Sequence, residues 1–224
     1  MQKPFITNAR MLAAYVQEVG MLPLFRSSIP GFSLRELTPR EYWFQDGVEG
    51  PWQWRETLAK EGKIAYGKLF SKKAGFVSMD WYPDLANYRR DGYDFDAKYE
   101  DGLISRRCKL IMDVLEREGA SLSSTIKRMA GFYKGGEKGF ETALTTLQMQ
   151  TYVTVREFFY NTNKKGEPYG WGIGRYTTSE SLFGADVVTS AYARTPAESY
   201  RRLFLHVQGL CPHATEAQIK ALLG

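Results

Sequence analysis

Histidine and cysteine are scarce in this sequence of 224 residues. It contains two histidines, His206 and His213, and two cysteines, Cys108 and Cys211. Two histidines exclude a multi-histidine metal site, and so few potential ligands argue against a Cys/His zinc site. Cys108 falls on the apolar stripe of an expected helix, which favours a buried free thiol over a disulfide. No Walker-type phosphate loop is present either, so we expect neither a metal nor a cofactor.

Long apolar runs are also missing. No segment approaches the about 20 apolar residues that are needed to span a bilayer, and residues 1–10 lack the apolar centre of a signal peptide. Hydrophobic residues make up 43% of the chain and aromatic residues 14%, which is ample for a packed core. We therefore expect a folded cytoplasmic protein that makes no contact with a membrane.

The net charge of +5 is confined to one segment of the chain. Residues 104–176 contain 12 Lys and Arg against 7 Asp and Glu, whereas the remaining residues carry 18 of each sign. A positive excess in one compact unit indicates a polyanionic partner, and nucleic acid is the leading one. A solvated basic face without a ligand is the alternative.

Apolar periodicity in the same segment predicts three helices and a β-hairpin. The helices are expected to begin near Ile104, Ser121 and Phe140, with Ser121 as the cap of the second helix and Met129 on its inner face. Residues 151–160 and 169–176 predict two strands, which residues 161–167 join as a polar tip. Three helices followed by a hairpin is the order of a winged helix-turn-helix, whose third helix enters the major groove of DNA.

This arrangement assigns DNA-binding roles to five cations. Lys134 and Lys138 flank the start of the third helix, and Lys164 and Lys165 lie at the hairpin tip, where phosphates are expected. Arg156 lies on the first strand of the hairpin. The expected partner is therefore duplex DNA, either intact or damaged.

The segment before the basic unit predicts helices and a small sheet. A helix is expected over residues 6–19, and a capping box over residues 38–41 predicts a second helix. Residues 64–70 and 74–79 read as two strands of a hairpin. Residues 91–102 are polar and charged, which is typical of a solvated linker and marks a domain boundary.

The segment after the basic unit predicts helices alone. Capping boxes begin at Thr195 and Thr215, each with its Glu or Gln partner three residues later. The fold class is therefore α+β, with a central winged helix-turn-helix. We expect an N-terminal α+β part over residues 1–102, the winged helix over 103–178, and C-terminal helices over 179–224.

Aromatic side chains outside the basic segment offer a second kind of contact with DNA, because they can stack on unpaired or flipped bases. Packing in the core is the alternative for these residues. They are Trp43, Trp52, Trp54, Tyr66 and Trp81. Trp171, on the second strand of the expected hairpin, is predicted to pack back on the helices.

The sequence Gln148-Met149-Gln150 lies where the third helix ends and the hairpin begins. A glutamine amide is a poor proton acceptor, but its paired donor and acceptor can position a water molecule or a base edge. Catalysis would also want a carboxylate near the water, and no motif places Glu141 or Glu157 there. Ordinary polar surface side chains are the alternative.

Together with Tyr152-Val153-Thr154-Val155-Arg156, this triplet resembles the Gln-apolar-Gln motif of the AlkZ/YcaQ-like DNA glycosylases. Residues 52–55, 65–70 and 74–78 resemble shorter bacterial proteins related to AlkZ, so the resemblance extends over most of the chain. It implies a winged-helix protein of DNA repair, in a family that excises alkylated or cross-linked bases. By this resemblance, Gln148 and Gln150 position the hydrolytic water against the sugar carbon.

Three functions follow from the sequence. The leading one is a DNA-binding winged-helix protein related to the AlkZ-type glycosylases, because the motif lies late in the chain and one winged helix is expected rather than several. The second is an active glycosylase that removes alkylated or cross-linked bases with Gln148 and Gln150. The third is a winged helix that serves as a protein-interaction module.

Overall fold

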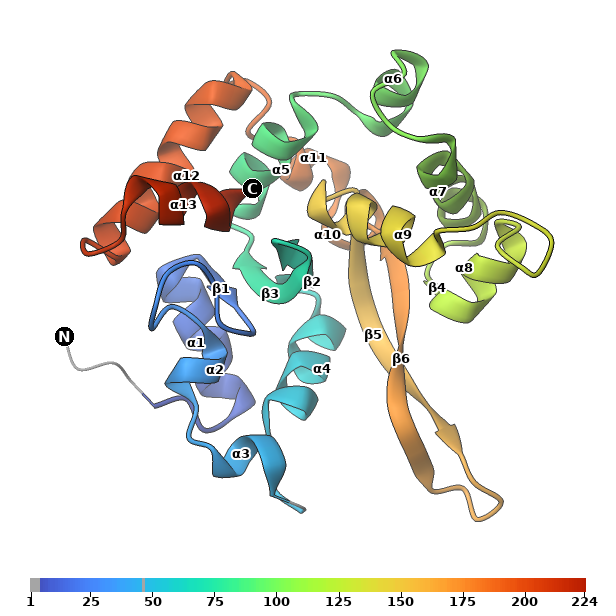
Figure 1. Ribbon diagram of the computed structural model, residues 1–224, viewed down its shortest axis with the longest axis horizontal. Helices are drawn as coiled ribbons and strands as arrows, with labels where there is room; N and C mark the ends of the chain where they lie inside the picture. Colours follow the sequence, from blue (N-terminus) through green and yellow to red (C-terminus); the bar gives the residue numbers. More distant parts are fainter. Residues whose placement is uncertain (1–4, 46) are drawn as a thin grey trace.

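The computed structural model describes residues 5–45 and 47–224, which form an α+β fold (Figure 1). The N-terminal part consists of α1 (Ala9–Val19), β1 (Met21–Pro23), α2 (Leu34–Leu37), α3 (Glu41–Phe44), α4 (Pro51–Glu61), β2 (Ile64–Phe70) and β3 (Lys73–Ser78). The middle part follows α5 (Tyr82–Arg90) and α6 (Phe95–Glu100), and consists of α7 (Arg106–Glu118), β4 (Ser121–Leu122), α8 (Ser123–Met129), α9 (Phe140–Met149), β5 (Val153–Thr162) and β6 (Pro168–Thr178). The last helices are α10 (Ser179–Phe183), α11 (Ala185–Val188), α12 (Pro196–Leu210) and α13 (Glu216–Leu223). Across the described ranges, every helix is too short or too polar to traverse a bilayer.

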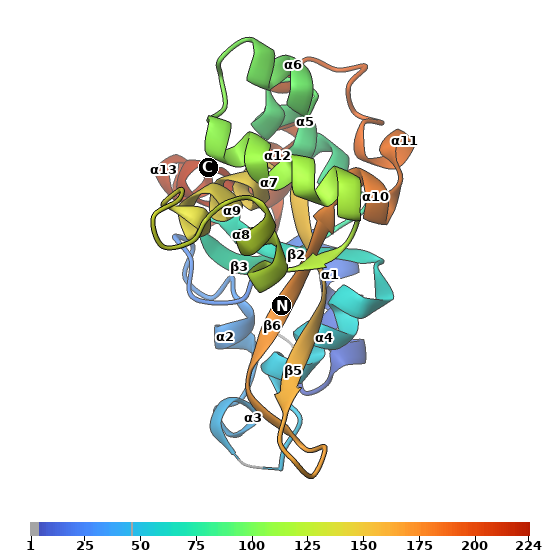
Figure 2. The same cartoon turned by 90° about the vertical axis from the view of Figure 1, so that its right-hand side faces the viewer.

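Two small antiparallel sheets organise the chain. The first has the strand order β1-β3-β2, and its β2–β3 turn places Ser71 and Lys72 at φ values of 47° and 66°. Positive φ at both central residues is what a tight two-residue hairpin turn requires. The second sheet has the order β4-β6-β5. Its strands β5 and β6 continue far beyond the short β4 and project from the body as a long hairpin beside α4 (Figures 1 and 2).

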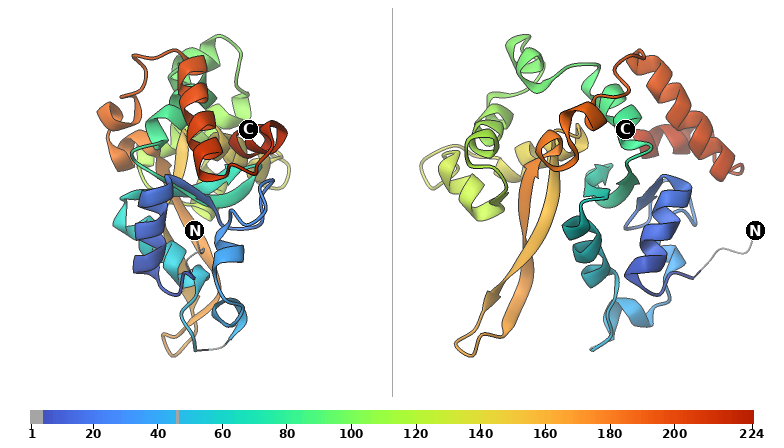
Figure 3. Two further views of the ribbon diagram at one scale, coloured as in Figure 1. Left: turned by 90° about the vertical axis from the view of Figure 1, so that its left-hand side faces the viewer. Right: turned by 180° about the vertical axis from the view of Figure 1, so that it is seen from behind.

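Buried side chains gather in three clusters. One unites α7, α8 and α9 with the start of β5, through residues such as Ile111, Ile126, Leu144 and Val153. Another lies under α1, α4 and the first sheet. The third joins the first sheet to the end of the chain, since Met21 and Val77 share it with Leu203 and Ile219. The C-terminal helices accordingly return to lie beside the N-terminal part (Figure 3).

The structure confirms most of the elements that periodicity predicts. The strands near residues 64–70 and 74–79 are present, and so are the three helices and the hairpin of the basic segment. Thr195 and Thr215 both close capping boxes. Cys108 is buried with a free thiol. The first helix begins three residues later than predicted, because Asn8 caps it by accepting a hydrogen bond from the Met11 amide.

Two of the predicted helix caps are wrong. Near residue 38, α3 begins only at Glu41 and has no side-chain cap, because Arg40 occupies the capping position. In the basic segment, Ser121 pairs with Tyr176 in β4, so α8 starts two residues later than predicted and Leu122 stands at its cap. Met129, at the end of α8, is exposed rather than inward-facing.

Residues 91–102 are not simply a solvated linker, because they contain α6. Asp94 caps this helix by accepting a hydrogen bond from the Ala97 amide. Phe95 is buried, and the Lys98 ammonium donates to the Arg90 carbonyl at 3.0 Å. Phe95 and Tyr99 pack on the core of the middle part, but two aromatic residues among charged ones are too few to show a helical period, which explains why the pattern predicted a linker.

Candidate nucleic-acid interface

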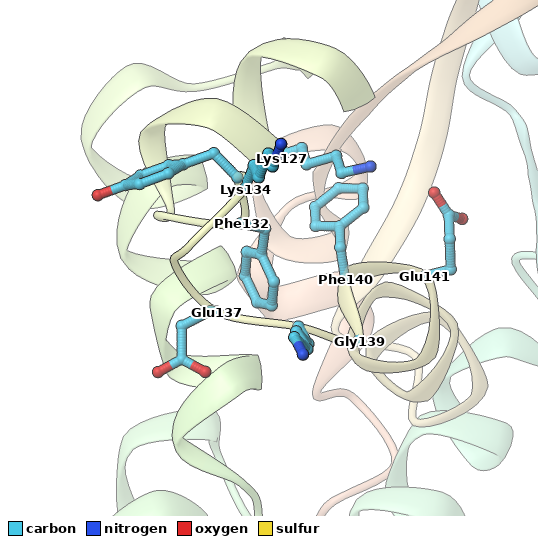
Figure 4. A pocket seen from close by; sticks show the side chains of 9 residues that line it. Lys127, Phe132, Lys134, Glu137, Gly139, Phe140 and Glu141 are labelled. Atoms are coloured by element: carbon cyan, nitrogen blue, oxygen red, sulfur yellow. The ribbon is translucent and has the colours of Figure 1, made fainter.

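The loop between α8 and α9 encloses a hollow of about 420 Å³ (Figure 4). Phe132 and Phe140 supply apolar lining, and three lysines, Lys127, Lys134 and Lys138, line it as well. All three lysines are exposed to solvent. α9 begins at this hollow after Gly139, which has a φ of 85° and offers no side-chain cap. The positive end of the helix dipole therefore lies among three cationic side chains.

Glu137 lines the same hollow but does not neutralise these lysines. Its carboxylate forms ion pairs with Arg106 and Arg107 on α7, and in Figure 4 it points away from the aromatic lining. Glu141, in the first turn of α9, also lines the hollow, so the lining has three lysines and two carboxylates and keeps a small excess of positive charge.

The tip of the β5–β6 hairpin carries the second pair of predicted DNA contacts. Lys164 and Lys165 are exposed. The Asn163 side-chain oxygen accepts hydrogen bonds from the Lys165 and Glu167 amides at 2.8 and 3.0 Å. Such a side-chain-to-backbone turn orders the tip without using either lysine, so both ammonium groups remain available to a partner.

Ion pairs divide the cations of residues 104–176 into two groups. Five cations pair with carboxylates, namely Arg106, Arg107, Lys109, Arg117 and Arg175. Seven have no carboxylate partner within residues 5–45 and 47–224, namely Lys127, Arg128, Lys134, Lys138, Arg156, Lys164 and Lys165. All five cations that the sequence assigned to DNA binding belong to the second group, and Lys127 is a neighbour that sequence reasoning missed.

Arg156 occupies a different place from the four lysines. Its guanidinium donates to the Lys60 carbonyl at 2.7 Å, which ties β5 to the end of α4. The structure therefore brings Lys134 and Lys138 together with Lys127, and Lys164 together with Lys165, but it places Arg156 with neither group.

Gln148 is buried between α9 and β2. Its side-chain oxygen accepts from the Lys68 amide at 3.0 Å, and its side-chain nitrogen donates to the Leu144 carbonyl at 3.2 Å. Gly67 lies so close that an added Cβ would be 3.2 Å from this oxygen. The oxygen of the Gln148 amide thus joins α9 to β2, while its nitrogen bonds within α9.

Gln150 has a different environment, because it lines a second hollow of about 420 Å³ on the outer face of α9. Lys68 and Lys72 line the hollow from the β2–β3 hairpin, and Glu141 and Thr145 line it from α9. The Gln150 side-chain oxygen is buried and has no hydrogen-bond partner among the described residues. The two glutamines therefore do not face a common cavity.

Two arginines from α5, the half-buried Arg89 and the buried Arg90, hold the turn that carries these glutamines. Arg89 donates to the Met149 carbonyl at 2.9 Å, and Arg90 donates to both the carbonyl and the hydroxyl of Thr151, at 2.7 and 3.1 Å. Burial lowers the pKa of the Arg89 guanidinium to about 10, so this group stays charged at neutral pH. Sequence reasoning missed both arginines in this role.

Thr151 adopts a φ of 62°, which a β-branched residue seldom does. Its carbonyl accepts from Tyr82 at 3.0 Å and from Ser179 at 2.5 Å, in addition to Arg90. Burial raises the pKa of the Tyr82 hydroxyl to about 12, so Tyr82 remains a donor. These hydrogen bonds thus hold Thr151 in a left-handed backbone conformation that is unfavourable for a β-branched residue.

The aromatic residues of the N-terminal part mostly pack inside the protein. Trp43, Trp54 and Tyr66 are buried, and Trp52 and Trp81 are half-buried. The prediction that Trp171 packs back on the helices is wrong, because its side chain is 80% exposed. β4 pairs with β6 only at Arg175 and Tyr176, so the third strand of this sheet ends before it reaches Trp171.

No three His, Cys, Asp or Glu side chains gather within the described ranges in a way that could hold a metal ion. Comparison with known proteins gives one family match: a family model described as AlkZ related matches residues 6–224. No curated protein and no solved structure matches the chain.

Proposed function

The chain belongs to the AlkZ-related family, and on this basis we propose that it binds duplex DNA and that residues 103–178 act as a winged helix-turn-helix. The parts before and after this unit, residues 1–102 and 179–224, would then act as its supports. The observation that carries the proposal is the position of the five unpaired lysines: they are exposed at two places on one unit, the α8–α9 loop and the hairpin tip.

The lysines at both places are expected to contact phosphate oxygens of the DNA. At the loop, Lys127, Lys134 and Lys138 surround the start of α9, whose dipole favours an anion. At the hairpin tip, Lys164 and Lys165 would neutralise phosphates farther along the duplex. This division into helix start and wing is the usual one for a winged helix on DNA.

Only the first turns of α9 are free to approach base edges. Toward its C-terminal end, Lys68 of β2 donates to the Thr145 hydroxyl at 3.2 Å, and Gln148 is buried against the same strand. Because β2 covers this end of α9, the contacts of the protein with DNA phosphates should outnumber its contacts with base edges. Backbone contacts carry no sequence information directly, so the proposed binding is largely independent of sequence.

Reversing the charge at the hairpin tip tests the wing. Lys164→Glu combined with Lys165→Glu should weaken duplex binding on every sequence alike and flatten the salt dependence by about two units of slope, since each lysine accounts for about one. Fluorescence anisotropy with two unrelated 20-base-pair duplexes at several salt concentrations measures both effects.

A matched control changes the net charge equally at a distance from the tip. Arg10 and Arg201 are exposed on α1 and α12, on the far side of the molecule from the hairpin (Figure 1). Arg10→Glu with Arg201→Glu should leave the slope unchanged. Equal losses in the two double variants would show that only total charge matters, and the wing would have no specific part in binding.

A second candidate function is base excision, and the position of Gln150 on the lining of the α9 hollow favours it. A water molecule held there by the Gln150 amide would be the nucleophile, as the family resemblance implies. Gln148 could not share this role in the conformation described, because both ends of its amide already have partners.

Separate alanine variants distinguish these roles. If the protein releases alkylated bases, Gln150→Ala should lower the single-turnover rate by about 100-fold with duplex affinity unchanged, since a positioning group acts mainly in the transition state. Gln148→Ala should instead lower the free energy of unfolding by about 2 kcal/mol, because it leaves the Lys68 amide without its acceptor. Base release from alkylated or cross-linked duplexes and thermal unfolding are the two measurements. A parent protein that releases no base would reject this second candidate and leave DNA binding untouched.

A further inference from the structure

The outer half of the β5–β6 hairpin exposes large aromatic side chains. Trp171 is 80% exposed and Tyr169, two residues nearer the tip, is 56% exposed; Phe159, on the opposite strand, is 43% exposed. An aromatic side chain of this size contributes most to stability when it is buried. Several exposed together on one projecting element therefore indicate a surface that a partner covers.

Other contacts fix the hairpin without using these rings. Phe158 and Tyr160 project to the α4 side, where Arg55 stacks over Phe158 at 4.3 Å and Glu56 accepts a hydrogen bond from the Tyr160 hydroxyl. Trp171 meets the half-buried Trp52 of α4 at a ring-centroid distance of 6.1 Å and an angle of 76°. This single edge contact orients Trp171 and leaves most of its surface in solvent.

Trp171 lies between two glycines of β6. Gly170 and Gly172 flank it in the sequence, and a Cβ at Gly170 would meet nothing within 4 Å. Gly170 also has a φ of 78°, so larger residues are disfavoured there. Beside Trp171, the backbone of β6 therefore borders open space at Gly170, whereas Tyr160 occupies the space at Gly172.

The charge around the exposed rings is positive. Lys164 and Lys165 lie at the tip, and three residues separate Trp171 from the end of the strand pairing, which is about 10 Å at the usual rise of a strand. Between Phe158 and Gly174, Glu167 is the one acidic residue, and its carboxylate accepts a hydrogen bond from Asn163. Exposed aromatic rings beside lysines are the combination that binds single-stranded nucleic acid.

We propose that the outer hairpin binds unpaired bases of single-stranded DNA, with Trp171 and Tyr169 as stacking surfaces and Lys164 and Lys165 as phosphate contacts. This proposal rests on the proposed DNA-binding function and makes it more specific. The target would be DNA in which a duplex adjoins an unpaired stretch. The α8–α9 loop would hold the duplex, and the hairpin would engage the bases that are out of the helix.

The test compares single-stranded and double-stranded DNA as ligands of the full chain. The probes are a 20-nucleotide oligothymidine, a 20-base-pair duplex, and the same duplex with a 10-nucleotide thymidine overhang. Trp171→Ala should weaken binding of the oligothymidine and the overhang by at least about 5-fold, the lower end of what one stacked base contributes. It should change affinity for the blunt duplex by less than about 2-fold, because the ring makes no phosphate contact.

Two further variants separate stacking from folding. Trp171→Phe keeps a flat ring and should restore most of the affinity, while the quenching of tryptophan fluorescence by oligothymidine should disappear. Leu205→Ala removes a side chain that is 53% exposed on α12, away from the hairpin, and should alter neither affinity. Unchanged melting temperatures for all three variants would show that the fold is intact.

The possible results of this test distinguish the stacking proposal from the proposed duplex binding. Equal losses on all three probes, or no loss on any, would overturn the stacking proposal while leaving duplex binding in place. Binding of the overhang and oligothymidine without any binding of the blunt duplex would reject the proposed duplex function but keep the stacking surface. A protein that binds none of the probes would overturn both, and Trp171 would then belong to a surface for another protein.

Discussion

Raising the salt concentration from about 50 to about 200 mM is expected to weaken binding of the protein to a duplex by about 500-fold. The reason is the number of lysines without a carboxylate partner at the α8–α9 loop and the hairpin tip, which are Lys127, Lys134, Lys138, Lys164 and Lys165. If each neutralises one phosphate, the logarithm of the binding constant falls with a slope of about −4.5 against the logarithm of salt concentration. Anisotropy titrations at four or five salt concentrations measure this slope.

The loop and the tip can be separated within the same experiment. Lys164→Gln with Lys165→Gln removes two of the five contacts and should leave a slope of about −2.7. Lys134→Gln with Lys138→Gln should do the same if the loop contacts the duplex to an equal extent. A parent slope near zero would mean that the basic segment is a solvated face, and the DNA-binding proposal would fail with it.

The sequence predicted the basic unit well because its evidence is local. Apolar residues at helical spacing, such as Cys108, Ile111 and Leu115, are buried as predicted, and the switch to alternating residues after Thr151 marks the start of β5 within two residues. Such patterns arise when one helix or strand packs on a single core. They can therefore be recognised in the sequence without knowing the rest of the fold.

The roles of the glutamines could not be predicted in the same way. Gln148 and Gln150 are two residues apart, yet one is buried against Lys68 and the other lines an open hollow. The difference arises because β2, which precedes Gln148 by 80 residues, packs on one face of α9. A motif of two identical side chains does not indicate which of them contacts a strand that lies 80 residues earlier in the sequence.

The prediction that Trp171 packs on the helices was wrong for a different reason. A tryptophan in a strand normally packs in a core, and the prediction for Trp171 followed this preference. The relevant signal was the alternation of Gly170, Gly172 and Gly174 with larger residues. Glycine at every second position leaves one face of β6 without side chains, and Tyr160 crosses that face at Gly172. The hairpin is therefore stabilised by its own aromatic residues and by α4, through Arg55 and Glu56, and not by the helices of the middle part.

Arg90→Ala is expected to lower the free energy of unfolding by about 3–5 kcal/mol, the usual loss when one member of a buried ion pair is removed. The Arg90 side chain is 1% exposed, and it forms an ion pair with Glu180 while donating two hydrogen bonds to Thr151. It also stacks over the Tyr152 ring at 4.3 Å. Its removal would leave Glu180 without a cation and Thr151 with fewer bonds to impose its left-handed backbone.

Thermal unfolding measures this loss, and the melting temperature should fall by about 10 °C, given the shift per kcal/mol that is usual for a chain of this length. Arg117→Ala is the control, since Arg117 pairs with Glu118 on the surface at 2.7 Å and such pairs contribute about 1 kcal/mol or less. Arg90→Lys should give an intermediate loss, because an ammonium keeps the charge opposite Glu180 but cannot span both acceptors of Thr151. If Arg90→Ala unfolds at the same temperature as Arg117→Ala, the turn after Gln150 is held by Tyr82 and Ser179 alone, and the buried arginine is not what maintains the positive φ of Thr151.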